Sequence, residues 1–376
     1  MKQGWEYGIL EDAVNKGSSN ISLKKIKGDD GDYPVFGAKG FVHNVSFYQQ
    51  ESEYLGIIKD GAGIGRVSRH PEKSSILATM QYILPKKGFD IQFINYFLNY
   101  INFEKYRTGS TIPHIYYKDY KSEPFPLVNI DEQKRIVAKL DECFEAIDKA
   151  RANVEKNLNN AKELFQSQLN EIFSQKGDGW VEKKLGDICE RVSVGHVGKT
   201  SEYYCGEEGI PFLRSQNVRK GYLDFKNIRY ITKDFHESLK KSQLCKGDLL
   251  FVRVGANRGD CSAVKEDYLE LNCANIVFAR PTSGNVKFLE YYCLSPIGRN
   301  RLLGMTTGSA QGVINTKSVE KLKISMPTEI EQNSIVSTLE DLRKKNQSLE
   351  SNYQQELDAL DELKKSILQK AFNGEL

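Results

Sequence analysis

The sequence TGSTIPHIYYKDY at residues 108–120 has a related copy, TGSAQGVINTKSV, at residues 307–319. The two copies begin 307 − 108 = 199 residues apart. The same offset aligns further pairs without a gap: Gln133 with Gln332, Leu140 with Leu339, Leu169 with Leu368, and Phe173 with Phe372. A fixed offset over such a length indicates an internal duplication, which changes how every shorter motif is interpreted.

The duplication extends upstream, where the offset changes because loops of the two copies differ in length. GWEYGILEDA at residues 4–13 returns as GWVEKKLGDI at 179–188, an offset of 175. KDGAGIGR at 59–66 resembles RVGANRGD at 253–260, an offset of 194, and FINYFL at 93–98 resembles FLEYYCL at 288–294, an offset of 195. The first copy is therefore shorter by 199 − 175 = 24 residues between its tryptophan and the shared TGS loop.

Charge divides the chain into the same parts. Residues 1–128 carry 16 basic and 14 acidic side chains (+2), and residues 177–328 carry 23 and 17 (+6). Residues 129–176 carry 8 and 9 (−1), and residues 329–376 carry 6 and 10 (−4). Basic globular parts joined by acidic segments are typical of domains that meet a polyanion, although ordinary scatter of surface charge is the alternative for the first part.

The acidic segments have the spacing of long helices. Apolar or small residues recur every three or four positions from Ile136 to Ile172, which no strand produces. The second copy repeats this stripe from Ile335 to Leu368, with Asn346 and Lys364 as exceptions. Each helix would extend about 60 Å and could not bury its stripe alone. We expect the two helices to pair antiparallel within the chain, with a globular domain at each end; pairing with a partner protein or a second copy is the alternative.

The globular parts are expected to be α+β, with short strands bounded by Gly, Pro and Asp. One amphipathic helix is predicted in each, over residues 91–109 and 286–304. Gly-bearing loops that carry Arg, Lys and Asn suit contacts with DNA phosphates and base edges.

Motifs for catalysis or cofactor binding are missing or incomplete. SVGHVGKT at residues 193–200 has Ser193 where a phosphate-binding loop needs its first glycine, and the five histidines have no metal-ligand spacing. Seven cysteines without a CxxC pair indicate free thiols in a reducing compartment. No signal core or membrane-spanning run is present, so we expect a cytoplasmic, non-catalytic protein without a metal or cofactor of its own.

The ordered set of motifs resembles the specificity (S, HsdS) subunit of type I restriction-modification systems along the whole chain. The segments that carry the resemblance are YPVFGAKGFV, KDGAGIGRV, TGSTIPHI and FPLVNIDEQKRIVAKLD in the first copy, with GDLLFVRVGANRGD, the 307–341 segment and LKKSILQKAFNGEL in the second. The resemblance implies target recognition domains at 1–128 and 177–328, which read the halves of a bipartite double-stranded DNA target. It also implies conserved spacer helices at 129–176 and 329–376. The compact first domain departs from the family and leaves open how many bases it contacts.

The resemblance further implies docking of two modification (methyltransferase) subunits, which would supply S-adenosylmethionine, and of restriction subunits, which would supply ATP- and Mg-dependent translocation and cleavage. A specificity subunit of a type IIB-like system is the nearest alternative. An enzyme acting alone and a coiled-coil scaffold without DNA recognition are more distant ones.

For DNA contacts we expect loop residues rather than strand interiors. The predicted set in the first domain is Lys39, His43, Lys59, Arg66, Arg69, Lys73, Arg107, Ser110 and Lys118. The predicted set in the second domain is Arg191, His196, Lys199, Arg214, Gln216, Asn217, Arg253, Asn257, Arg258, Ser309, Gln311 and Lys317.

Overall fold

The computed structural model describes residues 5–175, 177–266, 268, 270–304 and 312–376. They belong to two compact units: unit 1 comprises Met1–Glu155 with Gln354–Leu376, and unit 2 comprises Lys156–Tyr353. Each unit therefore contains one globular part and half of each long helix.

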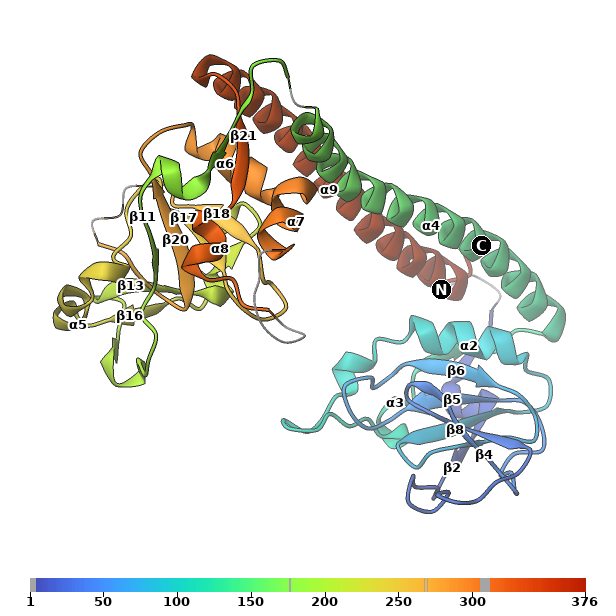
Figure 1. Ribbon diagram of the computed structural model, residues 1–376. Coiled ribbons are helices and arrows are strands. Elements are labelled where there is room, and N and C mark those ends of the chain that lie inside the picture. Colours follow the sequence, from blue (N-terminus) through green and yellow to red (C-terminus); the bar gives the residue numbers. More distant parts are fainter. Residues whose placement is uncertain (1–4, 176, 267, 269, 305–311) are drawn as a thin grey trace. The chain divides into compact units, whose positions relative to one another are not determined.

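In unit 1, a four-stranded antiparallel sheet has the order β2 (Val14–Ser18), β8 (Met80–Pro85), β5 (Tyr54–Ile58) and β6 (Val67–His70). A three-stranded sheet joins β4 (Gly40–Val45), β3 (Tyr33–Gly37) and β7 (Ser75–Ile76), and β3 runs parallel to β7. Helix α2 (Ile91–Tyr100) covers β5 and β6 (Figure 1). Asp90 caps this helix by accepting hydrogen bonds from the backbone N–H groups of residues 92 and 93.

Unit 2 repeats this arrangement with longer connections. Its four-stranded antiparallel sheet has the order β11 (Cys189–Val194), β20 (Ile276–Pro281), β17 (Leu249–Val252) and β18 (Cys261–Ala263). The second sheet has the order β12 (Tyr204–Cys205), β16 (Arg229–Ile231), β13 (Ile210–Arg214) and β19 (Asn272–Ala274), and β13 runs parallel to β19. Helix α6 (Val286–Leu294) is capped by Asn285 and corresponds to α2. The pairing β14 (Val218–Arg219) with β15 (Tyr222–Leu223) forms a hairpin in the longer second copy.

The remaining short elements complete the two units. In unit 1 they are β1 (Tyr7–Ile9), α1 (Leu10–Ala13), η1 (Phe103–Tyr106), α3 (Tyr117–Tyr120) and β9 (Pro124–Pro126). In unit 2 they are β10 (Val181–Lys184), η2 (Leu185–Ile188), η3 (Ser201–Tyr203), η4 (Ser215–Asn217), α5 (Lys233–Ser238), η5 (Lys240–Ser242), α7 (Pro296–Gly304), α8 (Thr316–Glu320) and β21 (Lys323–Met326).

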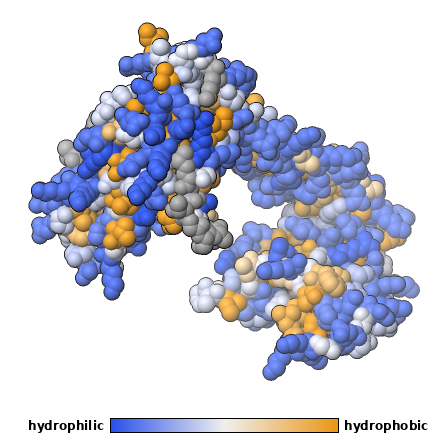
Figure 2. Space-filling model, viewed as in Figure 1, coloured by the Kyte–Doolittle hydropathy of each residue, from blue (hydrophilic) through white to orange (hydrophobic). Residues whose placement is uncertain are grey.

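The two predicted long helices are present as α4 (Ile130–Ser174) and α9 (Glu329–Phe372), packed together along their stripes (Figure 1). Within unit 1, Asp148 pairs with Lys364 at 3.3 Å and Arg151 pairs with Asp361. Residue numbers rise in one helix as they fall in the other, so the pair is antiparallel. The face of the helices visible in Figure 2 is largely hydrophilic, as expected where the apolar stripes face each other.

The last turn of each long helix packs into a hydrophobic core through an equivalent pair of phenylalanines. In unit 1, Phe372 at the end of α9 packs edge-on against Phe93 of α2, with ring centroids 5.4 Å apart. In unit 2, Phe173 at the end of α4 packs against Phe288 of α6, also at 5.4 Å. The offsets of the duplication align these two pairs, so the sequence repeat is also a structural repeat.

A buried glutamine fixes the start of each long helix. In unit 1, Gln133 accepts a hydrogen bond from the N–H of Asp90 at 2.7 Å, and donates to the carbonyls of Val128 and Gly88 at 2.8 and 3.1 Å. In unit 2, Gln332 accepts from the N–H of Asn285 at 2.8 Å and donates to the carbonyl of Pro327 at 2.9 Å. The repeated glutamine thus joins the capping residue of the short helix to the first turn of the long one.

The predicted helices over 91–109 and 286–304 are both shorter than expected. Helix α2 ends at Tyr100, because Ile101 is extended and Asn102 caps the separate turn η1. Its counterpart splits into α6 and α7, because Ser295 adopts an extended conformation before Pro296.

Candidate DNA interface

A glycine-rich loop follows the central strand of each four-stranded sheet and makes the same turn in both units. The N–H of Gly65 donates to the carbonyl of Ile58 at 2.9 Å, and the N–H of Gly259 donates to that of Val252 at 3.0 Å. Both glycines have positive φ angles, 79° and 83°. Because side chains other than glycine are strained there, the two loops need glycine at this position.

The loop that follows the TGS sequence packs against this glycine-rich loop. In unit 1, the N–H of Ile115 donates to the carbonyl of Lys59 at 3.0 Å. In unit 2, the N–H of Ile314 donates to the carbonyl of Arg253 at 3.2 Å. The first loop junction comprises residues 59–66 and 108–118. The second loop junction comprises residues 253–260 and 312–317.

Basic side chains occupy equivalent positions at the two junctions. Lys59 corresponds to Arg253 by the offset of 194, and Lys118 corresponds to Lys317 by the offset of 199. Lys118 and Lys317 are exposed on the short helices α3 and α8. At the first junction, Lys59 and Lys118 line a cavity of about 190 Å³ together with Lys16 of β2. Several cations around a small hollow are suited to anionic groups such as phosphates.

Apolar and aromatic side chains are exposed beside these cations. Ile112 is 57% exposed and Tyr116 is 49% exposed at the first junction, and Val254 is 48% exposed at the second. The ammonium group of Lys118 lies 5.5 Å from the centroid of the Tyr116 ring. Charged and apolar side chains side by side on exposed loops are characteristic of a surface that contacts a partner.

Comparison with known families identifies the family of this duplicated chain. The family model described as "Type I restriction modification DNA specificity domain" matches residues 2–157 and 177–359. The chain belongs to this family. Curated relatives that it matches are specificity subunits of type I restriction enzymes.

Individual relatives agree with the family. The specificity subunit of the type I restriction enzyme EcoKI from Escherichia coli K12 is 30% identical over 283 residues, which are 68% of this chain and 59% of that subunit. The chain spans about three fifths of the length of the first curated relatives it matches.

Solved structures share the fold of this chain. A chain solved in work on the complex assembly and conformational transition of the type I R-M system superposes with a TM-score of 0.77 at 19% identity, covering 100% of this chain and 99% of its own. The HsdS subunit from Thermoanaerobacter tengcongensis superposes with a TM-score of 0.56 at 18% identity, covering 100% and 98% of the two chains.

Eleven of the predicted contact residues are exposed. They are Lys39, Arg66, Arg69, Lys73, Arg107, Ser110, Lys118, Lys199, Gln216, Asn257 and Lys317. Three of the arginines have protein partners: Arg69 pairs with Glu53 at 2.6 Å, Arg107 pairs with Glu104 at 3.3 Å, and Arg66 donates to the carbonyl of Ala38 at 3.0 Å. Exposed pairs contribute only about 0 to 1 kcal/mol, so these side chains remain available to a phosphate.

Other predicted residues are half-buried and tied to the domain. Arg258 donates a hydrogen bond to the carbonyl of Gly312, and Arg253 donates from Nε to that of Ile314 at 3.3 Å. Both arginines therefore join the two loops of the second junction. His43 contacts the carbonyl of Asp29 at 2.9 Å through its ring nitrogen.

The second domain holds several of its predicted residues inside the fold. Arg191 donates to the carbonyl of Gln243 at 3.2 Å, and Arg214 donates to that of Asn227 at 3.0 Å. Asn217 is fully buried, accepts from the N–H of Arg214 at 3.0 Å and donates to the carbonyl of Asp224 at 2.8 Å. Asn217 has no surface to offer DNA in this conformation, and we leave it out of the proposed interface.

The buried pair of Arg280 and Asp248 orders the same region. Nε and Nη2 of Arg280 each lie 2.8 Å from one carboxylate oxygen of Asp248, which is fully buried. The hydrogen bonds to Asp248 raise the pKa of Arg280. Arg280 also donates to the Gln243 carbonyl that receives Arg191, at 3.2 Å.

The expectation that contact residues lie in loops does not hold for eight of them. Four lie in short helices: Lys118 in α3, Lys317 in α8, and Gln216 and Asn217 in η4. The other four lie in strands. His43 lies in β4, Arg69 in β6, Arg191 in β11 and Arg214 at the end of β13. In β4 and β6 these side chains project from an edge strand of their sheet. Ser309 and Gln311, and with them the second TGS sequence, lie outside the described residues.

Sequence reasoning missed Lys16, which shares the cavity of Lys59 and Lys118 although it is far from both in sequence. It also missed Lys240 and Lys241, which line a cavity of about 530 Å³ with His196. The His196 ring packs there against Phe235, with centroids 5.4 Å apart. Contacts between segments that are far apart in the sequence bring these side chains together, so no local pattern could have identified them.

Within the described part of the chain, no group of three or more His, Cys, Asp or Glu side chains is arranged to hold a metal ion. None of the helices described there is both long enough and apolar enough to span a membrane.

Proposed function

We propose that this chain reads a bipartite DNA target, with residues 1–128 and 177–328 as the two target recognition domains. The observation that carries this proposal is the repetition of the loop junction, with Lys59 and Lys118 in one domain and Arg253 and Lys317 at the equivalent positions of the other. Two copies of one surface with different loop sequences suit a target that has two different halves.

Phosphate and base contacts would divide between these side chains. Lys118 and Lys317, exposed on short helices beside the junctions, are placed to neutralise phosphates, which contributes affinity without sequence preference. Arg258, Asn257 and Gln216 have the fork or amide groups that read guanine and adenine edges in the major groove. Differences between the loops would then set the difference between the two half-sites.

The long helices, residues 129–176 and 329–376, would set the length of the unread spacer and dock two methyltransferase subunits. Those subunits would supply S-adenosylmethionine and the methyl transfer, and restriction subunits would add ATP- and Mg-dependent cleavage. The complex would act on DNA in the cytoplasm. What this chain contributes is the choice of sequence.

Equivalent substitutions in the two domains test the proposal. Lys118→Ala and Lys317→Ala should each weaken binding of the full chain, assembled with its methyltransferase, to its target duplex. Each should also reduce the slope of log K against log salt by about 1, because one phosphate contact is lost.

Lys87→Ala is the matched control. Lys87 is exposed and follows the C-terminal end of β8. Lys59 lies at the opposite end of this strand, where its N–H donates to the carbonyl of Thr79. Unchanged salt slopes in both junction variants, or an equal loss in the control, would count against the proposed surface.

A further inference from the structure

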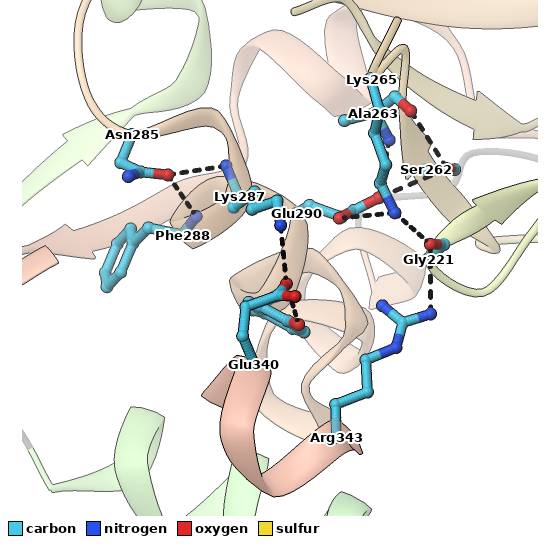
Figure 3. A network of polar contacts seen from close by, with 11 residues as sticks. Gly221, Ser262, Ala263, Lys265, Asn285, Lys287, Phe288, Glu290, Glu340 and Arg343 are labelled. Carbon is cyan, nitrogen blue, oxygen red and sulfur yellow. Dashed lines mark hydrogen bonds and ion pairs between the residues drawn. The ribbon is translucent and has the colours of Figure 1, made fainter. Parts of the chain in front are cut away.

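One carbonyl oxygen joins the second recognition domain to the long helix α9. Gly221, at the turn between β14 and β15, accepts a hydrogen bond from Nζ of Lys265 at 2.5 Å. The same oxygen accepts from Nη2 of Arg343 in α9 at 3.3 Å (Figure 3). The hairpin turn therefore lies between a lysine of the domain and an arginine of the spacer helix.

Glycine is required at this turn. Gly221 has a φ angle of 78°, and its N–H donates to the carbonyl of Cys261 at 2.9 Å. A Cβ atom added to Gly221 would lie 3.0 Å from Nη1 of Arg343 and 3.2 Å from Cδ1 of Leu294. The turn is thus fitted closely against both α9 and the end of α6.

Glu290 of α6 supports the lysine from inside the domain. Its side chain is 1% exposed, and Oε1 accepts from the N–H of Ala263 at 2.8 Å. Oε2 lies 3.6 Å from Nζ of Lys265, which Figure 3 shows between Glu290 and Gly221. Burial raises the pKa of Glu290, while Lys265, the Ala263 N–H and Arg343 oppose that rise.

The first copy shows that packing does not need this charge. In the first copy, Asn95 stands at the position equivalent to Glu290 (offset 195), and Phe144 stands at the position equivalent to Arg343 (offset 199). By contrast, the contact of the short helix with the long one is shared: Tyr291 donates to Glu340 at 2.6 Å, and Tyr96 donates to Asp141. A buried carboxylate is costly, so its use in one copy alone calls for a role other than packing.

We propose that Glu290, Lys265, Gly221 and Arg343 form a clamp that fixes the second recognition domain on helix α9, with Glu290 as the positioning residue that holds Lys265 in place. The inference rests on the proposed function, because a fixed domain restricts the bipartite target to one spacer length. The first domain has no such clamp among its described residues, so the second domain sets the tolerance for spacer length.

Glu290→Gln tests the clamp with a side chain of the same size. The amide oxygen can still accept from Ala263, but the charge that holds Lys265 is lost. Hydrogen–deuterium exchange of the full chain should show faster exchange in residues 218–223 of the variant and unchanged protection in the strands of unit 2. Arg343→Met removes the helix side of the clamp and should give the same result even if Glu290→Gln fails to fold, whereas Arg343→Lys should restore part of the protection.

The functional readout is spacer selectivity. Methylation rates of the chain with its methyltransferase are measured on its target and on duplexes with one base pair more or less between the half-sites. The ratio of the rate on the target to the rate on the altered duplexes should fall by about tenfold in Glu290→Gln, which corresponds to about 1.4 kcal/mol. The double variant should add little to either single one, because both remove the same clamp. Asn95→Gln, at the equivalent position of the first copy, is the control and should leave the ratio unchanged.

The possible outcomes separate the two proposals. Faster exchange with relaxed spacing supports the clamp. Unchanged spacing in both Glu290→Gln and Arg343→Met overturns it and leaves bipartite recognition intact. A wild-type complex that does not require two half-sites would overturn the proposed function itself.

Discussion

Replacing Gln332 by leucine should destabilise unit 2 by about 2 to 6 kcal/mol. The side chain is 3% exposed and satisfies the N–H of Asn285 and the carbonyl of Pro327. Leucine has a similar volume and helix propensity, so the main change is two buried backbone groups without partners, at about 1 to 3 kcal/mol each. Gln133→Leu should cost unit 1 at least as much, because it removes the two equivalent hydrogen bonds and a third one to the carbonyl of Gly88.

The two tryptophans allow the loss to be assigned to one unit. Trp5 lies in unit 1 and Trp180 in unit 2, so fluorescence during urea unfolding in a Trp5→Phe background reports on unit 2. With m values of about 1 to 3 kcal/mol/M, Gln332→Leu should lower the Trp180 midpoint by about 0.7 M or more. Gln347→Leu, at an exposed position of the same helix, is the control and should change stability by less than about 0.5 kcal/mol. A midpoint shift no larger than that of the control would refute the reasoning.

Two further predictions concern buried ionisable groups. Burial lowers the pKa of His70 from 6.5 to about 4, so its neutral form stabilises unit 1 above pH 6.5 and this contribution is lost as the pH falls toward 4. Between pH 7 and pH 5 the free energy of unfolding of unit 1 should fall by about 2 kcal/mol from this group. The fall should disappear in His70→Asn and persist in the control His43→Gln. Parallel pH profiles of stability for wild type and His70→Asn would exclude a contribution from His70. Asp248→Asn should destabilise unit 2 by about 3 to 5 kcal/mol, because Arg280 is left without its charged partner. Urea unfolding followed at Trp180 measures this loss, and replacing both residues by leucine and methionine should recover much of it.

The long helices and the duplication could be predicted from sequence because their signals are local and repeated. The spacing of three and four residues defines a helical stripe whatever it packs against, and α4 and α9 each begin six residues before the stripe starts. The offset of 199 also pairs the glutamines at 133 and 332, which share two hydrogen bonds in the structure. A pattern met twice in one chain is stronger evidence than either copy alone.

The details of the candidate site depend on tertiary contacts that no local pattern contains. Asn217 has the side chain of a base-reading residue, but the turn at Asp224 uses it instead. Lys16 reaches the first junction only because β2 pairs with β8. The clamp at Gly221 uses three segments that are far apart in the sequence, so only the fold could bring Lys265 and Arg343 to one oxygen atom.

The central claim is that two domains of one chain read two separate half-sites. Methylation-sensitive sequencing of DNA from a host that carries this chain with its methyltransferase tests it most directly. The account predicts one divided motif, with two specified segments and an unspecified gap of constant length. Methylation at a contiguous, undivided motif would contradict it.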